Sequence, residues 1–208
     1  MILFKSKSSY YKQIKYTRLI SYYWQMHYIT SYTPDSVLEL GVGDSIVASM
    51  LKAMGYSILT CDISTDVAAD VVADIKNLPF KDNSFDLVAS FQVLEHLEYE
   101  HFSQCLRSLH GIARKHVLLS LPQGRKYFEF KIHLPWMKKD GYFGISRDMP
   151  RFPAYKKPAG RSHYWEIGVQ GYSLNRVVKD IERAGFRILV NRSIPQNLYH
   201  RFFVLGKK

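Results

Sequence analysis

Residues 37–44, Val-Leu-Glu-Leu-Gly-Val-Gly-Asp, constrain the fold more than any other part of the chain. An apolar segment containing Glu39 runs directly into two glycines, Gly41 and Gly43, spaced one residue apart. Glycine has no Cβ atom, so it permits a tight turn and a close approach of the backbone to a ligand. The pattern therefore predicts a strand at 36–40, a turn on which a nucleoside-bearing ligand can lie, and a helix at about 45–54 that Asp44 caps and Gly55 ends.

Acidic residues also follow the next two predicted strands. Asp62 follows the apolar segment 57–61, about 20 residues after the glycines, which is the spacing of a carboxylate that binds ribose hydroxyls in a βαβ unit. Asp74 ends a short strand at 71–74 and precedes Ile75. A fourth strand, at 85–90, leads into Gln92. Polar groups thus recur at successive strand ends.

The later part of the chain continues the alternation of strands and helices. A helix is predicted at 100–113, a strand at 117–121, a helix at 174–184 and strands at 186–190 and 201–205. Strands that alternate with helices imply a mostly parallel sheet with right-handed crossovers. One face of the helix at 100–113 is apolar and is expected to pack on the sheet; it carries Phe102, Cys105, Leu106, Leu109 and Ile112.

These features together resemble the class I S-adenosylmethionine-dependent methyltransferases, and most closely their type 11 group. The resemblance is dense over residues 35–121 and loose elsewhere. It implies a Rossmann-like α/β fold, a seven-stranded sandwich whose last strand is antiparallel and lies between strands five and six. We therefore expect an N-terminal helical extension at 1–34 and a methyltransferase domain at 35–208.

The resemblance also implies a cofactor, S-adenosyl-L-methionine, and the residues that bind it. Glu39 would help to hold the methionine ammonium group, and Asp62 would accept hydrogen bonds from the ribose hydroxyls. Asp74 would accept from the adenine amino group, while the backbone amide of Ile75 reaches a ring nitrogen. Gln92 would lie near the transferred methyl group, and Gly41 and Gly43 would let the backbone approach the ligand.

A nicotinamide or flavin dinucleotide fold shares the strand, the turn and the ribose acid. It also needs a small third residue, because helix and strand must pack closely under a pyrophosphate. This chain has Ile46 at that position, which argues against a dinucleotide. The methyltransferase pattern often has a third glycine at position 45, where this chain has Ser45.

The segment 122–171 breaks the rhythm, with five prolines, many aromatic residues and ten basic residues up to position 161. It leaves the carboxyl end of a predicted strand, where ligands bind in open α/β sheets. We interpret this long irregular connection as a lid that faces the substrate. Near its end lies His163 in the sequence His-Tyr-Trp-Glu, and we take His163 as the candidate catalytic residue. Packing is the alternative role for this sequence.

Two other groups of polar residues have alternative interpretations. Glu95-His96 has the look of an acid/base pair, but the resemblance favours a structural or cofactor-shaping role, since this pair is common in the family across unlike substrates. His133, His163 and Glu166 could imitate metal ligands. They lack a short fixed spacing, so we expect no metal site.

Charge is distributed unevenly. Residues 35–121 carry twelve acidic and six basic residues, whereas the flanking parts are basic and bring the whole chain to +11. A positive field attracts an anionic partner, although a solvated basic surface is the alternative.

Residues 9–30 predict a helix whose packing face carries Tyr16, Leu19, Ile20, Tyr23 and Met26. Contact of this helix with an anionic membrane surface is the alternative.

The sequence therefore predicts methyl transfer to a small anionic metabolite or to a lipid or sugar intermediate. The alternatives are an RNA methyltransferase and a non-catalytic S-adenosylmethionine-binding regulator. No apolar segment is long enough to span a bilayer. The two cysteines form no metal or redox motif, which suggests reduced thiols in a cytoplasmic protein. The methyl acceptor and the oligomeric state stay open.

Overall fold

The computed structural model describes residues 15–124, 127–132, 134–137, 143–148, 163–194 and 196–207. The helices are α1 (Tyr16–Ser31), α2 (Ile46–Ala53), α3 (Phe102–Ile112) and α4 (Leu174–Arg183), with short 3-10 helices η2 (Leu94–His96) and η3 (Tyr99–His101). The strands are β1 (Val37–Leu40), β2 (Ile58–Asp62), β3 (Val71–Val72), β4 (Phe85–Phe91), β5 (Ala113–Pro122), β6 (Tyr127–Ile132), β7 (Phe143–Asp148), β8 (Phe186–Ile194) and β9 (Asn197–Lys207).

The main sheet has seven strands in the order β3-β2-β1-β4-β5-β9-β8. The first five are parallel, and β9 is antiparallel to both β5 and β8. The sequence prediction of a Rossmann-like α/β sandwich with an antiparallel last strand is confirmed. The carboxyl ends of the parallel strands share one edge of the sheet, which is where ligands bind in this architecture.

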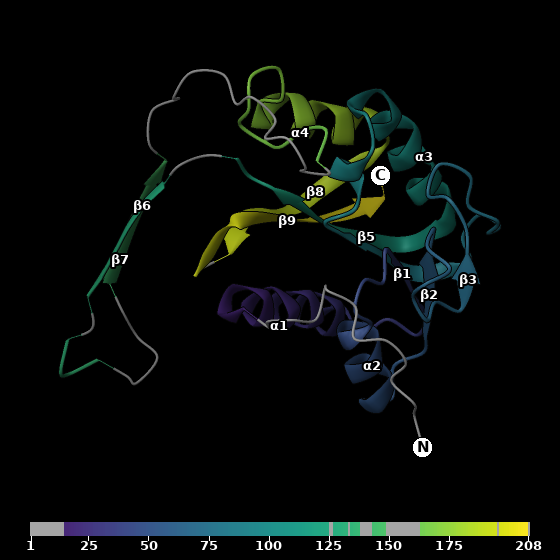
Figure 1. The fold of residues 1–208 in the computed structure, drawn as a ribbon, viewed down its shortest axis with the longest axis horizontal. Helices are drawn as coiled ribbons and strands as arrows, with labels where there is room; N and C mark the ends of the chain where they lie inside the picture. The colour runs from purple at the N-terminus through teal and green to yellow at the C-terminus, as the bar shows by residue number, and fades with distance from the viewer. Residues whose placement is uncertain are drawn as a thin grey trace.

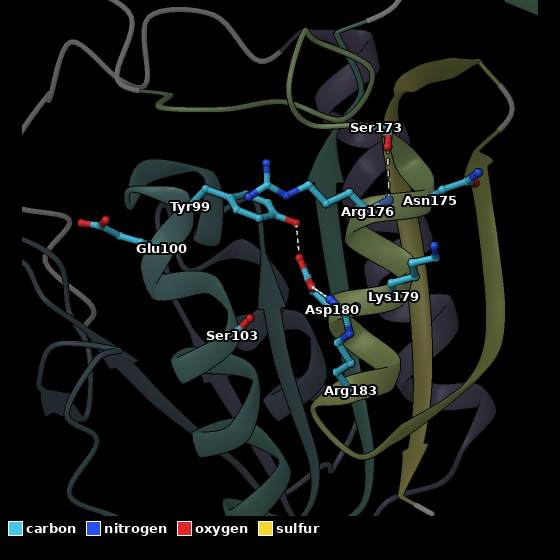
Figure 2. Close-up of a pocket in the computed structure, with 9 residues that line it drawn as sticks. All are labelled: Tyr99, Glu100, Ser103, Ser173, Asn175, Arg176, Lys179, Asp180 and Arg183. Atoms are coloured by element: carbon cyan, nitrogen blue, oxygen red, sulfur yellow. Dashed lines mark hydrogen bonds and ion pairs between the residues drawn. The ribbon is translucent and has the colours of Figure 1, made fainter.

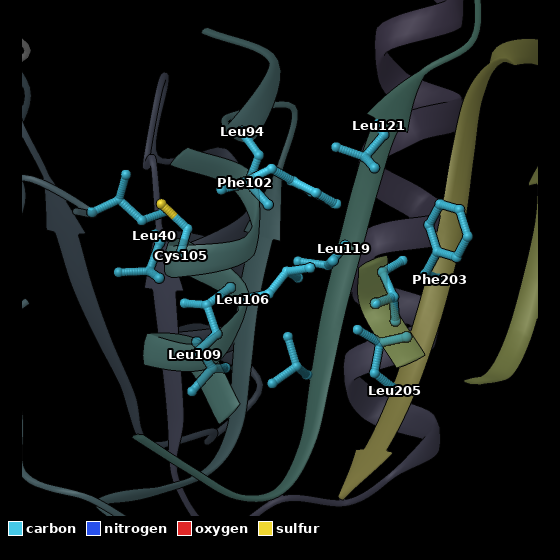
Figure 3. Packing of buried hydrophobic residues seen from close by; sticks show 14 of the residues in the cluster. Leu40, Leu94, Phe102, Cys105, Leu106, Leu109, Leu119, Leu121, Phe203 and Leu205 are labelled. Carbon is cyan, nitrogen blue, oxygen red and sulfur yellow. The ribbon is translucent and has the colours of Figure 1, made fainter. Parts of the chain in front are cut away.

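Helices cover both faces of this sheet: α1 and α2 lie on one face, and α3 and α4 on the other (Figure 1). Alternate residues of one strand therefore enter different cores, because successive strand side chains point to opposite faces. Leu119 and Phe203 pack with α3 in the larger core, whereas Leu118 and Phe202 belong to the core under α1 and α2. Figure 3 shows the larger core between α3 and strands β5 and β9.

The predicted apolar face of α3 is confirmed, since all five of its named residues are buried.

The boundaries of several strands differ from the predictions. β5 begins at Ala113, directly after α3, because Ala113 already pairs with Phe85 of β4, and His116 pairs with both β4 and β9 after a register shift. β8 and β9 are also longer than predicted, since each supplies hydrogen-bond partners for the other. β3 is shorter, so Asp74 lies beyond its end rather than within it.

The packing face of α1 was the least accurate of the sequence predictions. The residues expected to pack include Tyr16 and Tyr23, whose exposed fractions are 66% and 56%. Leu19 is exposed as well, while Ile20 and Met26 pack partly against the core. The buried positions are instead Ser21, Gln25, Tyr28 and Ile29.

Hydrogen bonds explain why polar residues of α1 face the protein. Ser21 Oγ lies 2.8 Å from His200 Nδ1, and Gln25 Nε2 donates to Ser21 Oγ at 3.1 Å. Asn197 Nδ2 donates to the carbonyl oxygen of Thr17 at 3.1 Å. Buried polar groups need such partners, so α1 packs on the polar end of β9 through hydrogen bonds. Hydrophobic periodicity cannot predict a helix face that packs through polar hydrogen bonds.

The start of α2 also differs from the prediction. Ser45, not Asp44, is the N-cap residue, and its backbone is left-handed with φ of 59° and without a side-chain capping bond. Asp44 Oδ1 instead accepts from the Ile46 amide at 3.4 Å, and Asp44 Oδ2 accepts a hydrogen bond from the Tyr22 hydroxyl. Asp44 thus joins the turn to α1.

The segment predicted as an irregular lid contains regular structure. β6 and β7 form an antiparallel two-stranded sheet that lies apart from the main sheet (Figure 1). The chain then returns to the main sheet, where Gln123 and Ile167 form a parallel bridge. The lid assignment itself stays a prediction.

In the part of the chain that the structure describes, no helix is both long and apolar enough to cross a membrane.

Candidate functional site

The glycine turn lies at the carboxyl end of β1 and packs against the residues after β4. Gly41 has φ of 78°, and a Cβ atom there would lie 2.2 Å from Val93 Cγ2, so only glycine fits. Gly43 also has a left-handed backbone, with φ of 55°. No heavy atom would lie within 4 Å of a Cβ at Gly43, and this residue is exposed. The turn is therefore closed toward β4 and open at Gly43.

Asp62 connects this turn to the next strand ends. Its Oδ2 accepts a hydrogen bond from the Val42 amide at 2.8 Å, and its Oδ1 accepts from the Ser64 amide at 2.9 Å. The Asp62 carbonyl oxygen accepts from the Ala73 amide at 3.0 Å. A carboxylate has about four lone-pair positions, so both oxygens retain capacity for a ligand hydroxyl. The structure thus brings the glycine turn, Asp62 and the end of β3 together.

Asp74 and Ile75 follow β3 at the same edge. Asp74 Oδ1 accepts from the Lys76 amide at 2.9 Å, and Lys76 Nζ lies 3.4 Å from Asp74 Oδ2. Ile75 is buried and joins the larger core. These contacts hold the side chain of Asp74 at the edge of the sheet. The family resemblance predicts an adenine-binding acid at this position.

Glu39 is buried within β1, and its Oε2 has no hydrogen-bond partner among the described residues. Burial, with a smaller contribution from Asp44, raises the pKa of the Glu39 carboxyl to about 8. A buried carboxyl without a full set of partners is unfavourable in the ligand-free protein. A positively charged group bound beside Glu39 would favour the ionised form.

Gln92 lies immediately after β4 with φ of 57°, a left-handed conformation that ends the strand. The Gln92 backbone amide donates to the Ser120 carbonyl oxygen at 3.0 Å, and the side-chain Nε2 donates to Ser120 Oγ at 3.2 Å. The side chain of Gln92 is therefore held toward β5. The residues after β4 and β5 lie next to one another at the ligand-binding edge.

A second polar group lies on the β5 side of this edge. Glu95 and His96, in η2, face the segment that begins at His163, because the Tyr164 amide donates to the Glu95 carbonyl oxygen at 2.8 Å. The rings of His96 and His163 are 4.8 Å apart and nearly perpendicular. Burial, and secondarily the nearby Glu166, raises the pKa of Glu95 to about 8.

Glu166 and Tyr199 hold His163 from the other side. His163 Nδ1 lies 3.0 Å from Glu166 Oε1, and the Tyr199 hydroxyl donates to the same oxygen at 2.8 Å. Sequence reasoning identified the His-Tyr-Trp-Glu segment but missed Tyr199. Tyr199 lies in β9, which the sequence predicted to begin at residue 201, so no signal in the sequence connects it to His163. His133, the other histidine considered, lies outside the described residues.

The segment around His163 lines a cavity of about 200 Å³ together with Trp165, Val169 and Tyr172. A larger cavity of about 470 Å³ lies between α3 and α4 and is shown in Figure 2. It is lined by Tyr99, Arg176 and Asp180 among others, and by none of the predicted site residues. Two of its charged residues, Asp180 and Arg183, form an ion pair at 3.3 Å.

Comparison with known proteins agrees with this geometry. Residues 38–121 match the family model described as a methyltransferase domain, whereas the search of curated proteins finds no match. A solved Pyrococcus horikoshii OT3 protein is 14% identical with a TM-score of 0.61, and the alignment covers 95% of this chain and 93% of that chain.

Two enzymes solved with S-adenosylhomocysteine have similar structures. The Burkholderia thailandensis 1,6-didemethyltoxoflavin-N1-methyltransferase is 11% identical, with a TM-score of 0.58 and coverage of 90% of this chain and 78% of that chain. The magnesium protoporphyrin IX methyltransferase of Synechocystis PCC 6803 is 14% identical, with a TM-score of 0.59 and coverage of 94% and 89%. Residues 38–121 are therefore similar to a methyltransferase domain, and the chain as a whole has the same fold as these solved methyltransferases.

Proposed function

We propose that this chain transfers the methyl group of S-adenosyl-L-methionine to a small-molecule acceptor that is anionic or is an intermediate of lipid or sugar biosynthesis. The cofactor would lie along the carboxyl ends of β1, β2, β3 and β4. The residues proposed to hold it are Glu39, Gly41, Gly43, Asp62, Asp74, Ile75 and Gln92.

Each proposed contact follows from the chemistry of the group at that position. Asp62 offers two acceptor oxygens to the ribose hydroxyls, in an orientation fixed by the Val42 and Ser64 amides. Asp74 offers an acceptor to the adenine amino group. Glu39 would pair with the methionine ammonium group, which supplies the positive charge that its buried carboxyl lacks.

One observation carries the choice of a small acceptor, namely that the two ends of the proposed lid are hydrogen-bonded to one another and to residues at the ends of β4 and β5. The Gly124 amide donates to the Ile167 carbonyl at 3.0 Å, and the Ile167 amide donates to the Pro122 carbonyl at 2.9 Å. With the Tyr164–Glu95 backbone bond, these contacts hold the segment that lines the 200 Å³ cavity, including His163, beside the ends of β4 and β5. A cavity of this size suits a compact acceptor better than a long polymer.

The sulfonium of the cofactor supplies the driving force for methyl transfer, so the protein has to align the acceptor, exclude water and accept any released proton. His163 is the proposed proton acceptor for a hydroxyl acceptor. Because a carboxylate only accepts hydrogen bonds, Glu166 favours the tautomer in which His163 Nδ1 carries the proton. That leaves a lone pair on Nε2 to receive another.

The test incubates the protein with methyl-labelled cofactor and a cell extract separated into small-molecule, RNA and protein fractions. Label in the small-molecule fraction supports the proposal, and label in RNA replaces it with the RNA alternative. Tight binding of S-adenosylhomocysteine without transfer to any fraction would indicate a cofactor-binding regulator. Asp62→Ala is the matched control variant and should weaken S-adenosylhomocysteine binding by about 1–3 kcal/mol through lost charge-assisted hydrogen bonds.

A further inference from the structure

The side chain of Glu95 is completely buried, yet neither carboxylate oxygen has a hydrogen-bond partner among the described residues. Burial of a carboxyl group without partners is costly, and buried polar groups in folded proteins are almost always paired. Glu95 also lies on a short 3-10 helix at the ligand-binding edge rather than in a strand of the core. A partner that is not part of the chain would explain this arrangement.

Two histidines lie beside this carboxylate. One ligand atom each from Glu95, His96 and His163 can be chosen so that all three lie within 4.8 Å of one another. Metal–nitrogen and metal–oxygen bonds of about 2.1 Å place two ligands of one ion roughly 3–4 Å apart. Small rotations of the side chains are therefore enough to bring all three atoms onto one ion.

The backbone and the neighbouring side chains hold the three residues in this arrangement. The Tyr164–Glu95 backbone hydrogen bond fixes the segment of His163 against η2. Glu166 is buried and accepts from His163 Nδ1, and Tyr199 donates to the same Glu166 oxygen. A carboxylate that orients a histidine through its second nitrogen is the usual support of a metal-binding imidazole.

We propose that Glu95, His96 and His163 form a binding site for one divalent transition-metal ion. Two imidazoles and one carboxylate suit borderline metals such as Zn²⁺, Co²⁺, Mn²⁺ or Fe²⁺, whereas Mg²⁺ and Ca²⁺ favour ligand sets made of oxygen. Three protein ligands leave coordination positions open. Sequence reasoning considered His163 as a metal ligand only with His133 and Glu166, because a long stretch of chain separates His163 from Glu95-His96 and no short spacing connects them.

The site has a consequence that rests on the proposed function. An acceptor with a hydroxyl or carboxylate oxygen would occupy an open position of the ion. Its oxygen, after losing any proton to water, would attack the methyl carbon, and the electron pair of the carbon–sulfur bond would remain on sulfur to give S-adenosylhomocysteine. His163 then acts as a metal ligand rather than as the proton acceptor, and the metal keeps its oxidation state.

The chain provides an internal control. Glu98, Glu100 and His101 also place ligand atoms within 4.8 Å of one another, but the two glutamates are exposed and His101 is only half-buried. This second cluster includes no buried carboxylate without a partner among the described residues. Exposed acidic groups of this kind are well solvated, and we expect no stoichiometric metal binding there.

The test uses the full-length chain without a histidine tag, freed of metal by a chelator and titrated with Zn²⁺ and with Co²⁺. We expect one ion per chain and, with Co²⁺, visible absorption bands from nitrogen and oxygen ligation. His96→Ala, His163→Ala and Glu95→Gln should each lower the affinity by at least about tenfold, while His101→Ala leaves it unchanged. His96 is exposed, so His96→Ala removes a ligand without opening the core.

Metal binding in His96→Ala equal to that of the natural chain would overturn the proposal. So would the absence of stoichiometric binding in the natural chain, or a loss of affinity in His101→Ala. Binding of S-adenosylhomocysteine, measured on the same metal-free samples, shows that each variant is folded. The labelled-methyl assay, run on the natural chain with and without metal, separates failure of the metal site from failure of the proposed methyl transfer.

Discussion

The proposed pairing of Glu39 with the methionine ammonium group predicts that cofactor binding depends on pH. In the ligand-free protein burial holds the proton on its carboxyl up to about pH 8, whereas an ammonium group requires the carboxylate. Binding below that pH must therefore release a proton, so affinity should rise as pH increases toward 8. Calorimetric titration with S-adenosylhomocysteine should show tighter binding at pH 7 than at pH 6, by up to about tenfold.

Two controls make this pH dependence specific to Glu39. Glu39→Gln should bind more weakly, and its affinity should be nearly the same at the two pH values. Repeating the titration in buffers with different ionisation enthalpies should reveal proton release in the natural chain alone. Affinity in the natural chain that does not change between pH 6 and pH 7 would remove Glu39 from the ammonium site.

Ser45 holds a conformation that glycine adopts more readily. Its φ of 59° is left-handed, and its side chain makes no capping bond that would offset this cost. Ser45→Gly should therefore raise the free energy of unfolding by about 0.5–1 kcal/mol. Ser49→Gly, at an exposed position inside the same helix, should lower it by a similar amount. Denaturant unfolding of the two variants would contradict this interpretation if both were destabilised.

At the scale of elements, a hydrogen bond joins η3 to α4. The Tyr99 hydroxyl donates to Asp180 Oδ2 at 2.8 Å, and the Arg176 guanidinium lies 4.3 Å from the centre of the Tyr99 ring (Figure 2). Tyr99→Phe keeps the ring and removes only the hydrogen bond. We expect this variant to have a free energy of unfolding about 1 kcal/mol lower than that of the natural chain. Its affinity for S-adenosylhomocysteine should be unchanged.

Tyr23→Phe is the control for that change, because Tyr23 is exposed on α1. Its thermal midpoint should equal that of the natural chain, whereas the Tyr99→Phe midpoint should fall by about 2–4 °C. A Tyr99→Phe midpoint equal to that of the Tyr23 control would mean that the hydroxyl bond does not stabilise the packing of η3 on α4.

The elements that could be predicted from the sequence are those whose buried residues are apolar and recur at the spacing of a helix or a strand. α3 places its apolar residues at helical spacing and buries all of them, and the apolar strands precede Gly41 and Asp62 as expected. α1 could not be predicted in the same way. Its inner face carries Ser21, which is hydrogen-bonded to the distant His200, and Gln25, which donates to Ser21; hydrophobicity cannot recognise such contacts.

The same distinction applies to the candidate site. Gly41, Asp62 and Asp74 follow successive strands, so a parallel sheet brings them to one edge, and their order in the sequence is sufficient to predict this. The group formed by Glu95, His163 and Tyr199 comes from three separated segments. Only the packing of the returning chain on η2 and β9 brings them together.

At the scale of the whole molecule, local stability should differ between the two sheets. β4 and β5 lie in the middle of the main sheet between two hydrophobic cores. β6 and β7 pair only with each other in the described structure and lie apart from the main sheet (Figure 1). A two-stranded hairpin is marginally stable on its own.

Hydrogen exchange followed by mass spectrometry tests this difference. Amides of β4 and β5 should exchange at least about a hundredfold more slowly than those of β6 and β7. The β8–β9 pair is the control, because it is also antiparallel but belongs to the main sheet. Equal protection of β6–β7 and β4–β5 would show that the hairpin is stabilised by contacts beyond its own ladder.

The position of β9 affects how this protein can fold during its synthesis. In the described sheet β8 reaches the other strands only through β9, which inserts between β5 and β8. On the ribosome, β1 to β5 can pair as they emerge, but β8 has no strand partner, and its backbone groups bond to water, until β9 leaves the exit tunnel. A premature stop codon before residue 197 would therefore leave two strands unplaced instead of one, and would expose the apolar flank of β5 to aggregation.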